Sequence, residues 1–330
     1  MATLQSLSAG LIVSPSGRGN GAIAEMLATS KFIAALEQLS AFQLEAFTNK
    51  FRPYADTITV RNRDVNGALS NDTYSPADEQ SASMSIIGGK LAYDNVYQRD
   101  VARNLGGFNF EKDLQMKFRT WVKGLESQLL VGSGAGTPKE VKGILTILDG
   151  TNNIPGYSET RVINAKDYAK IDDAKKFNIG TSDTADETLE DLMVMLIAVM
   201  GSVENANLVV MRNELWSMIQ ALAFGKSVIG YTESNFGVKY QTLFGVPVVP
   251  VTAGMTLTEN DDTTTPLEDT TSMLIMSLGE NNLSLPTQGF SWIDFDAVEN
   301  KEAGVEKWEL PLNWRISNPK SVTRVRNIAI

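Results

Sequence analysis

The sequence predicts an α+β fold. Segments with a helical spacing of apolar residues are interleaved with alternating, strand-like segments, and the strand–helix–strand rhythm of a doubly wound parallel sheet is absent. No internal repeat is visible. With 330 residues, of which 43% are hydrophobic, the chain can bury one elaborate core or two ordinary ones.

The composition excludes every catalytic mechanism and metal site that requires histidine or cysteine. The chain contains neither histidine nor cysteine, which excludes Ser-His-Asp and Cys-His catalysis, zinc held by His or Cys, iron–sulfur clusters and disulfides. The formal net charge of −10 disfavours tight binding to nucleic-acid phosphates. We therefore expect a structural or assembly protein with no catalytic residue, cofactor or metal.

No segment predicts a membrane span or an export signal. The apolar runs, such as residues 193–200, are far shorter than the roughly 20 residues of a membrane-spanning helix. Residues 1–20 lack a basic n-region and contain only a short apolar run at 11–13, so we expect no signal peptide.

The N-terminal part predicts an arm followed by a helix. Residues 1–21 are rich in glycine and serine and show little periodicity. From residue 22 to about residue 47, apolar side chains such as Ile23, Met26 and Leu27 recur at three- and four-residue steps, which predicts a helix that ends before Pro53.

A long hairpin is predicted next. Residues 57–60 alternate like a strand, residues 61–83 are mostly polar, and strand character resumes at 84–87 and 90–97. An isolated two-stranded hairpin of roughly fifty residues is marginal in water, so its partner surface is expected on another chain; a flexible surface loop is the alternative. Charged residues in and beside the hairpin are predicted to contact a neighbour or simply to keep the element soluble: Arg61, Arg63, Asp64, Lys90, Arg99 and Arg103.

Residues 110–131 predict the clearest helix. Phe118, Val122, Leu125 and Leu129 lie on one stripe, Asn109 can cap the start and Gly132 can end the helix. At 1.5 Å per residue this helix is roughly 33 Å long, enough to run through a whole domain. The following glycine-rich segment 132–145 lacks the phosphate-loop spacing and is expected to be a connector.

The second half alternates helices and strands. Proline at 247 and 250 cannot donate to a ladder, so the apolar segment 244–251 predicts an edge or irregular strand. Helices are predicted at 185–200 and 214–224, and further strands at 207–211, 272–278, 290–298 and 308–316.

Two acidic groups offer alternatives to a purely structural role. Asp294 and Asp296 alternate beside Trp292, as in a glycoside hydrolase, but a solvated strand face has the same pattern and is favoured. The loop 259–269 could offer oxygen ligands to calcium, yet it lacks the DxDxDG spacing, and a solvated loop is favoured.

The order of segments resembles the major capsid proteins of tailed phages, which share the Hong Kong 97-type fold. An arm, a long hairpin, a spine helix, a central α+β domain and returning strands follow one another. The local matches are FEKDLQMKFRTWVKGLESQLLVGSG, the connector ending KGIL, ANLVVMRNELWSMIQAL, FGVPVVPV and WELPLNWRISNPKSVTRV. The resemblance covers nearly the whole chain and rests on the order of the segments together with these degenerate motifs.

The resemblance implies a division of the chain. Residues 1–50 would form the N-terminal arm and helix, and 51–106 the extended hairpin, or E-loop, that reaches over a neighbouring subunit. Residues 107–200 would form the peripheral domain with the spine helix, 201–285 the axial domain, and 286–330 the strands that return to the peripheral domain.

The resemblance also implies a function and partners. Such chains assemble as pentamers and hexamers into an icosahedral head around double-stranded DNA, without reading its sequence. Because no long scaffolding segment precedes the arm, a separate scaffolding protein or prior cleavage is implied, and the intact Met1 argues against cleavage. A portal and possibly decoration proteins are the further partners. The chain would be made in the host cytoplasm and reside in the virion. The alternatives are an encapsulin-like nanocompartment shell, a carboxylate-dependent hydrolase, and a fibre or surface-layer protein.

Overall fold

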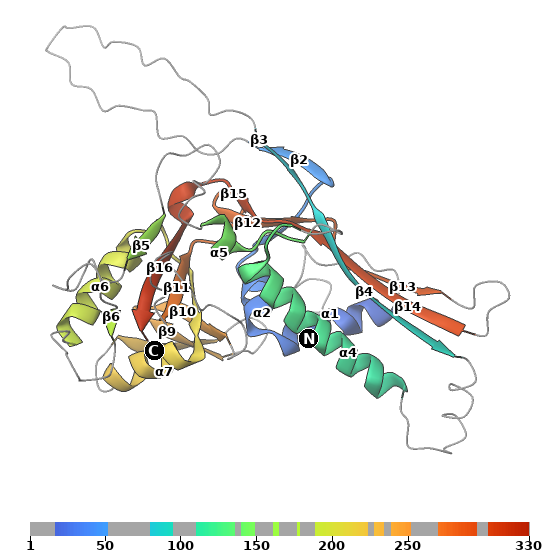
Figure 1. Ribbon diagram of the computed structural model, residues 1–330, viewed down its shortest axis with the longest axis horizontal. Coiled ribbons are helices and arrows are strands. Elements are labelled where there is room, and N and C mark those ends of the chain that lie inside the picture. Colours follow the sequence, from blue (N-terminus) through green and yellow to red (C-terminus); the bar gives the residue numbers. More distant parts are fainter. Residues whose placement is uncertain are drawn as a thin grey trace, which may run out of the picture.

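The described elements form two large sheets, the helices that cover them and a separate two-stranded sheet (Figure 1). The computed structural model describes residues 17–51, 80–94, 110–135, 140–148, 161–164, 177–178, 189–223, 228–233, 239–251, 270–295 and 303–329. The predicted α+β class is confirmed, because both mixed sheets and separate helices are present.

The larger sheet has eight strands. Their order is β5 (Val162–Asn164), β16 (Val322–Ala329), β11 (Thr270–Met276), β7 (Leu208–Arg212), β10 (Val246–Val251), β9 (Lys239–Leu243) and β8 (Ile229–Glu233), with β6 (Phe177–Asn178) also pairing with β16. The predicted strands at 207–211 and 272–278 are confirmed, with ends shifted by one or two residues.

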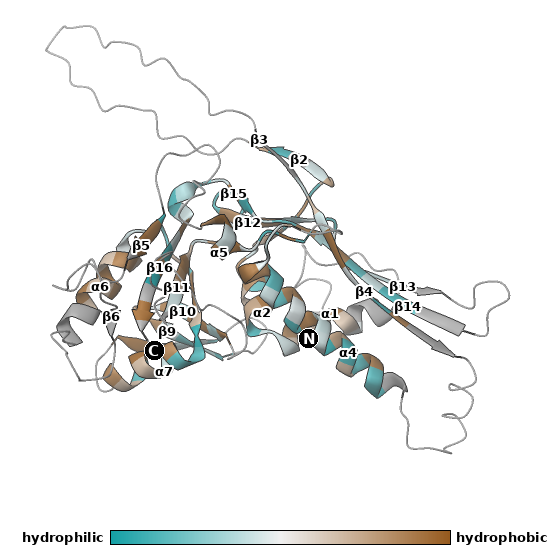
Figure 2. Ribbon diagram, in the orientation of Figure 1, coloured by the Kyte–Doolittle hydropathy of each residue, from teal (hydrophilic) through white to brown (hydrophobic). Residues whose placement is uncertain are grey.

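Both faces of the central strands of this sheet are buried. On β11, Met273 and Ile275 pack into an apolar cluster with α6 (Leu189–Gly201) and α7 (Asn213–Leu222), whereas Leu274 and Met276 enter a second cluster on the opposite face. A strand buried on both faces reads as a continuous apolar run, which is what the sequence shows at 207–211. In Figure 2 the strands and α6 accordingly carry much of the apolar colour.

The prediction of an edge strand at 244–251 is wrong. β10 lies inside the sheet, parallel to β7 and antiparallel to β9. Successive N–H groups of a strand point to opposite edges, so Pro247 and Pro250, three residues apart, can cost at most one donor at each edge; the ladder with β9 covers residues 246–248 and the ladder with β7 covers residues 248–251. The two buried apolar faces outweigh this loss.

The smaller sheet has six strands. Its path is β1 (Phe42–Leu44), β12 (Leu283–Thr287), β14 (Ala303–Leu312) and β13 (Ser291–Phe295), while β15 (Arg315–Ile316) pairs with β12 and β4 (Ser85–Asp94) with β14. β4 is one continuous strand where the sequence predicted two pieces. The predicted strand 308–316 is instead divided between β14 and β15 by Asn313 and Trp314.

Helix α4 (Phe110–Val131) has the bounds that the sequence predicted. Phe118, Val122, Leu125 and Leu129 are buried, and the helix alternates hydrophilic and hydrophobic colours along its length (Figure 2). At its end the chain turns back, and Gly143 donates its N–H to the carbonyl of Gly132 at 2.8 Å. A Cβ on Gly132 would lie 2.1 Å from the carbonyl oxygen of Val141, so only glycine fits this turn before the short helix α5 (Ile144–Ile147).

The predicted continuous helix over 22–47 is wrong beyond residue 38. Two helices form, α1 (Gly17–Thr29) and α2 (Lys31–Gln38), because Ser30 adopts an extended conformation and its hydroxyl caps α2 by accepting the N–H of Ile33. Ser40 then takes a left-handed φ of 54° and ends the helix, after which the chain continues as β1.

Candidate assembly surfaces

An antiparallel strand pair forms the base of the predicted hairpin. β2 (Thr48–Phe51) pairs with β3 (Gln80–Ser83), and the N–H of Met84 donates to the carbonyl of Phe47 at 3.0 Å. The intervening residues 52–79 lie outside the described part of the chain. The predicted contact residues Arg61, Arg63 and Asp64 are among them.

Lys90 is the predicted contact residue that the structure places. It is exposed on β4 directly opposite Lys307 of β14, and Lys307 pairs with Glu309 at 2.5 Å. Like charges on opposite residues of a ladder repel, so this face can accept a further acidic group. Arg99 and Arg103 lie outside the described residues.

Apolar side chains are exposed where the hairpin joins the smaller sheet. Leu44, Phe47 and Ile86 are 50%, 39% and 52% exposed, and they flank the hydrogen bond between Phe47 and Met84. The apolar side chains of Val194 and Ile197 on α6 are exposed as well. Exposed apolar side chains gathered in one region are typical of surfaces that another protein covers.

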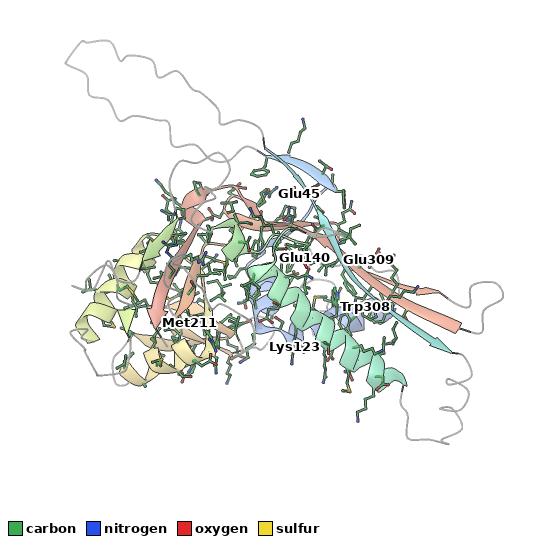
Figure 3. All side chains as sticks on the ribbon, in the orientation of Figure 1. Glu45, Lys123, Glu140, Met211, Trp308 and Glu309 are labelled. Atoms are coloured by element: carbon green, nitrogen blue, oxygen red, sulfur yellow. The ribbon has the colours of Figure 1, made fainter. Side chains whose placement is uncertain are left out.

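An aromatic cluster joins α4 to the smaller sheet. The rings of Phe118 and Trp121 on α4 pack against Phe290, Trp292 and Trp308, with centroid distances of 5.1–6.4 Å within the cluster. Figure 3 labels Trp308 beside α4 and Glu309 on β14. The indole N–H groups of Trp121 and Trp308 are buried and have no acceptor among the described residues, so packing rather than hydrogen bonding holds these two rings.

The same cluster bears on the hydrolase alternative. Trp292 is buried, stacks on Trp308 at 5.1 Å and donates its indole N–H to the carboxylate of Glu306 at 2.6 Å. The Trp292 ring is therefore part of the core, and its face is not exposed for stacking against a sugar. Asp294 lies on β13 opposite Glu306, and Asp296 and the loop 259–269 lie outside the described residues.

Two buried carboxyl groups lie where the N-terminal helices meet the core. Ser30 donates its hydroxyl to Glu126 of α4 at 2.7 Å. Burial raises the pKa of Glu126, against the Ser30 hydrogen bond and the Lys123 charge, which lower it. Burial also raises the pKa of Glu37 on α2, to about 7. By contrast, the Arg119 guanidinium lowers the pKa of Glu25 on the surface between α1 and α4.

Two basic residues of the C-terminal segment form an ion pair and a hydrogen bond that the sequence did not indicate. Arg315, buried on β15, forms an ion pair with Glu45, which lies just before β2. Arg324, buried on β16, donates to the carbonyl of Leu145 at 3.2 Å and so connects the larger sheet to α5. Sequence spacing carried no signal for either contact, because the partners are far apart in the chain.

Within the described ranges, no group of three or more acidic side chains is arranged to hold a metal ion. In the same residues no helix is long and apolar enough to cross a membrane.

The comparisons with known proteins identify the fold. No family model and no curated protein sequence matches the chain. The capsid of cyanophage A-1(L) is similar in structure at 13% identity with a TM-score of 0.59, covering 92% of this chain and 94% of that one. The capsid of a native GTA particle has 13% identity, a TM-score of 0.55 and 90% coverage of both chains.

A shell of a different kind is similar as well. The SrpI encapsulin of Synechococcus elongatus has 14% identity and a TM-score of 0.51, covering 87% of this chain and 84% of that one. The chain therefore has the Hong Kong 97-type fold, as the sequence resemblance implied. At these identities the likeness establishes the fold and leaves the function to be argued.

Proposed function

We propose that this chain is the major capsid protein of a tailed phage. It assembles with itself, as pentamers and hexamers, into a closed icosahedral shell that encloses double-stranded DNA. The observation that carries the proposal is the likeness to the cyanophage A-1(L) capsid over nine-tenths of both chains. A shell gains its stability by repeating modest contacts many times, which suits a chain with exposed apolar and charged surfaces and an acidic balance.

The proposal assigns roles to the regions. The hairpin that begins at β2 and β3 reaches a neighbouring subunit, with Lys90 and the charged residues at 61–64 and 99–103 as contacts. Residues 201–285, which supply α7 and the strands β7, β10 and β11 of the larger sheet, act as the axial domain, and residues 107–200 with α4 act as the peripheral domain. β16, from the terminal segment 286–330 that was predicted to return to the peripheral domain, lies in the larger sheet instead. A scaffolding protein, a portal and decoration proteins are the further partners in the virion.

A nanocompartment shell is the second candidate. The likeness to the SrpI encapsulin complex favours it. The acidic charge of the chain fits either content, because a shell can enclose DNA without binding it tightly.

Negative-stain electron microscopy of the purified protein, followed by nuclease treatment, tests both candidates. Closed particles that contain nuclease-protected double-stranded DNA support the capsid. Closed particles that contain a co-purified protein instead support the nanocompartment. A protein that stays monomeric across a range of concentration and salt contradicts both.

A further inference from the structure

Three consecutive residues, the two that separate β14 from β15 and the first residue of β15, each bind a different part of the molecule. Asn313 donates its side-chain amide to the carbonyl of Ser83 at 3.1 Å. Trp314 donates its indole N–H to the carbonyl of Leu129 at 2.8 Å. The guanidinium of Arg315 donates to the carboxylate of Glu45.

The partners of this corner, residues 313–315, are the two legs of the hairpin and the end of α4. Glu45 directly follows β1 and lies three residues before β2, at the root of the outgoing leg, and Ser83 ends β3, on the returning leg. Leu129 lies in the last turn of α4. Figure 3 shows Glu45 beneath the β2–β3 pair, and Figure 1 shows β15 in the same region as the end of α4. One short segment therefore holds both legs against one helix.

The corner is itself fixed in place. The N–H of Trp314 donates to the side-chain oxygen of Asn313 at 2.9 Å, and the Trp314 ring is buried in the core. Arg315 pairs with Ser284 in the ladder of β15 and β12 and donates to its hydroxyl at 3.1 Å. A side chain whose own position is fixed by packing and a second hydrogen bond can orient its partner.

The contact with the outgoing leg is charge-assisted. The Arg315 side chain is 9% exposed and that of Glu45 is 24% exposed, so water screens the pair only partly. The backbone reinforces it, because the N–H of Glu45 donates to the carbonyl of Thr287 at 3.0 Å. The residue at the root of the outgoing leg is thus held in the smaller sheet by a backbone contact and a side-chain contact.

We propose that the corner at 313–315 is a positioning element that fixes the direction of the β2–β3 hairpin relative to α4. A second copy of this chain is the partner that the hairpin reaches, so the corner decides the angle between neighbouring subunits and hence the curvature of the shell. The part about curvature rests on the proposed function. The part about the hairpin direction applies to the unassembled chain as well.

Asn313→Asp is the most selective test. It keeps the side-chain oxygen that accepts the N–H of Trp314 but replaces the donor to Ser83 by an acceptor, so two oxygens face each other. In the unassembled protein we expect the amide of Met84, which bonds across the hairpin base, to exchange with deuterium about tenfold faster. The amides of Val210 and Ile275 in the larger sheet are expected to keep their rates.

Asn207→Asp is the matched control. Asn207 also donates its amide to a carbonyl, that of Leu278 at 2.9 Å, and its oxygen accepts the N–H of Leu278 at 2.8 Å. This variant makes the same chemical change away from the hairpin, so Met84 should exchange at the wild-type rate. If both variants change the Met84 rate equally, or neither does, the corner has no positioning role. If Asn313→Asp fails to fold, Glu45→Gln weakens the other leg and answers the same question.

The particle diameter, measured by electron microscopy, tests the curvature. Asn313→Asp is expected to shift or broaden the diameter distribution, whereas Asn207→Asp should leave the diameter of the particles that form unchanged. Particles of unchanged diameter from Asn313→Asp would overturn the link to curvature. A wild-type protein that forms no closed particle would instead defeat the proposed function, and the exchange rates would then decide the hairpin direction alone.

Discussion

The two cores of this molecule are built differently. The cluster under α6 and α7 consists of aliphatic and methionine side chains with one tryptophan, Trp216. The core around α4 contains an aromatic cluster, and it buries the charged or ionisable side chains of Glu37, Glu126, Glu306 and Arg315. An aliphatic core tolerates exchange of one apolar side chain for another, whereas a core with buried polar groups requires each group to keep its partner. We infer that the second core gives the hairpin and α4 a unique relative position.

The largest expected effect is loss of an aromatic ring from the second core. Phe118→Ala removes a fully packed ring that touches four others, and we expect the free energy of unfolding to fall by about 3–5 kcal/mol. Urea unfolding of the unassembled protein measures it. Met211→Ala in the first core is the control, with an expected loss of about 2–5 kcal/mol and no change in the near-ultraviolet signal of the tryptophans around Phe118. Equal spectral changes in both variants would contradict the separation of the two cores.

The next effect is a pH dependence due to Glu37. Burial raises its pKa from 4.5 to about 7 in the folded protein, so the unfolded chain loses this proton first as the pH rises. The contribution to stability is complete below pH 4.5 and is lost as the pH rises to about 7, by on the order of 3 kcal/mol. Urea unfolding between pH 4 and 8 measures this loss, and Glu37→Gln should make the curve less steep in that window, with the remaining slope due to Glu126, whose pKa burial also raises.

Glu25→Gln separates this effect from a general response to pH. The pKa of Glu25 is lowered by Arg119, so its contribution is present at neutral pH and is lost as the pH falls through the folded-state pKa. The variant should therefore alter the acidic end of the curve and leave the slope between pH 5 and 7 in place. A wild-type curve that is flat in that window would show that Glu37 is not buried as the structure has it.

A smaller effect is expected at the close approach of β4 to the aromatic cluster. A Cβ on Gly89 would lie 2.4 Å from the ring of Trp308, so Gly89→Ala forces the ring or the strand to move. Overpacking of this kind costs about 1–3 kcal/mol. Thermal unfolding and tryptophan fluorescence of the unassembled protein should both change, and an unchanged melting temperature would mean that β4 does not contact Trp308.

The smallest effect has the opposite sign. Gly124 lies on the exposed side of α4, and a Cβ there would meet nothing within 4 Å. Gly124→Ala should therefore stabilise the protein by about 0.5–1 kcal/mol, because alanine favours the helix. A rise in the urea midpoint at unchanged slope is the expected result. A loss of stability would indicate that this side of α4 is covered.

The periodic elements could be predicted from the sequence. The helix at 110–131 was found with both ends, because its apolar stripe continues without a break to Gly132. The strand near 207–211 was found because an apolar run of this length is typical of a strand buried on both faces. The hairpin contacts at 61–64 and 99–103 stay predictions, since those residues lie outside the described part of the chain.

Local patterns failed where a tertiary contact outweighed them. The apolar spacing after residue 38 continued, yet Ser40 ended the helix and the next residues joined β12 as a parallel strand. The two prolines of β10 suggested an edge, but burial on both faces placed that strand inside the sheet. In both cases the local preference is worth less than the packing that replaced it.

The sequence by itself determined the α+β class, the long helix, the absence of His and Cys chemistry, and the order of segments that resembles phage capsid proteins. Only the tertiary structure decided which polar groups meet: Ser30 with Glu126, Arg315 with Glu45, and Asn313 with Ser83. Periodicity is a property of neighbours along the chain, so a single sequence displays it. A contact between residues that are 96 or more positions apart, as these are, depends on how the elements pack, and no local pattern records it.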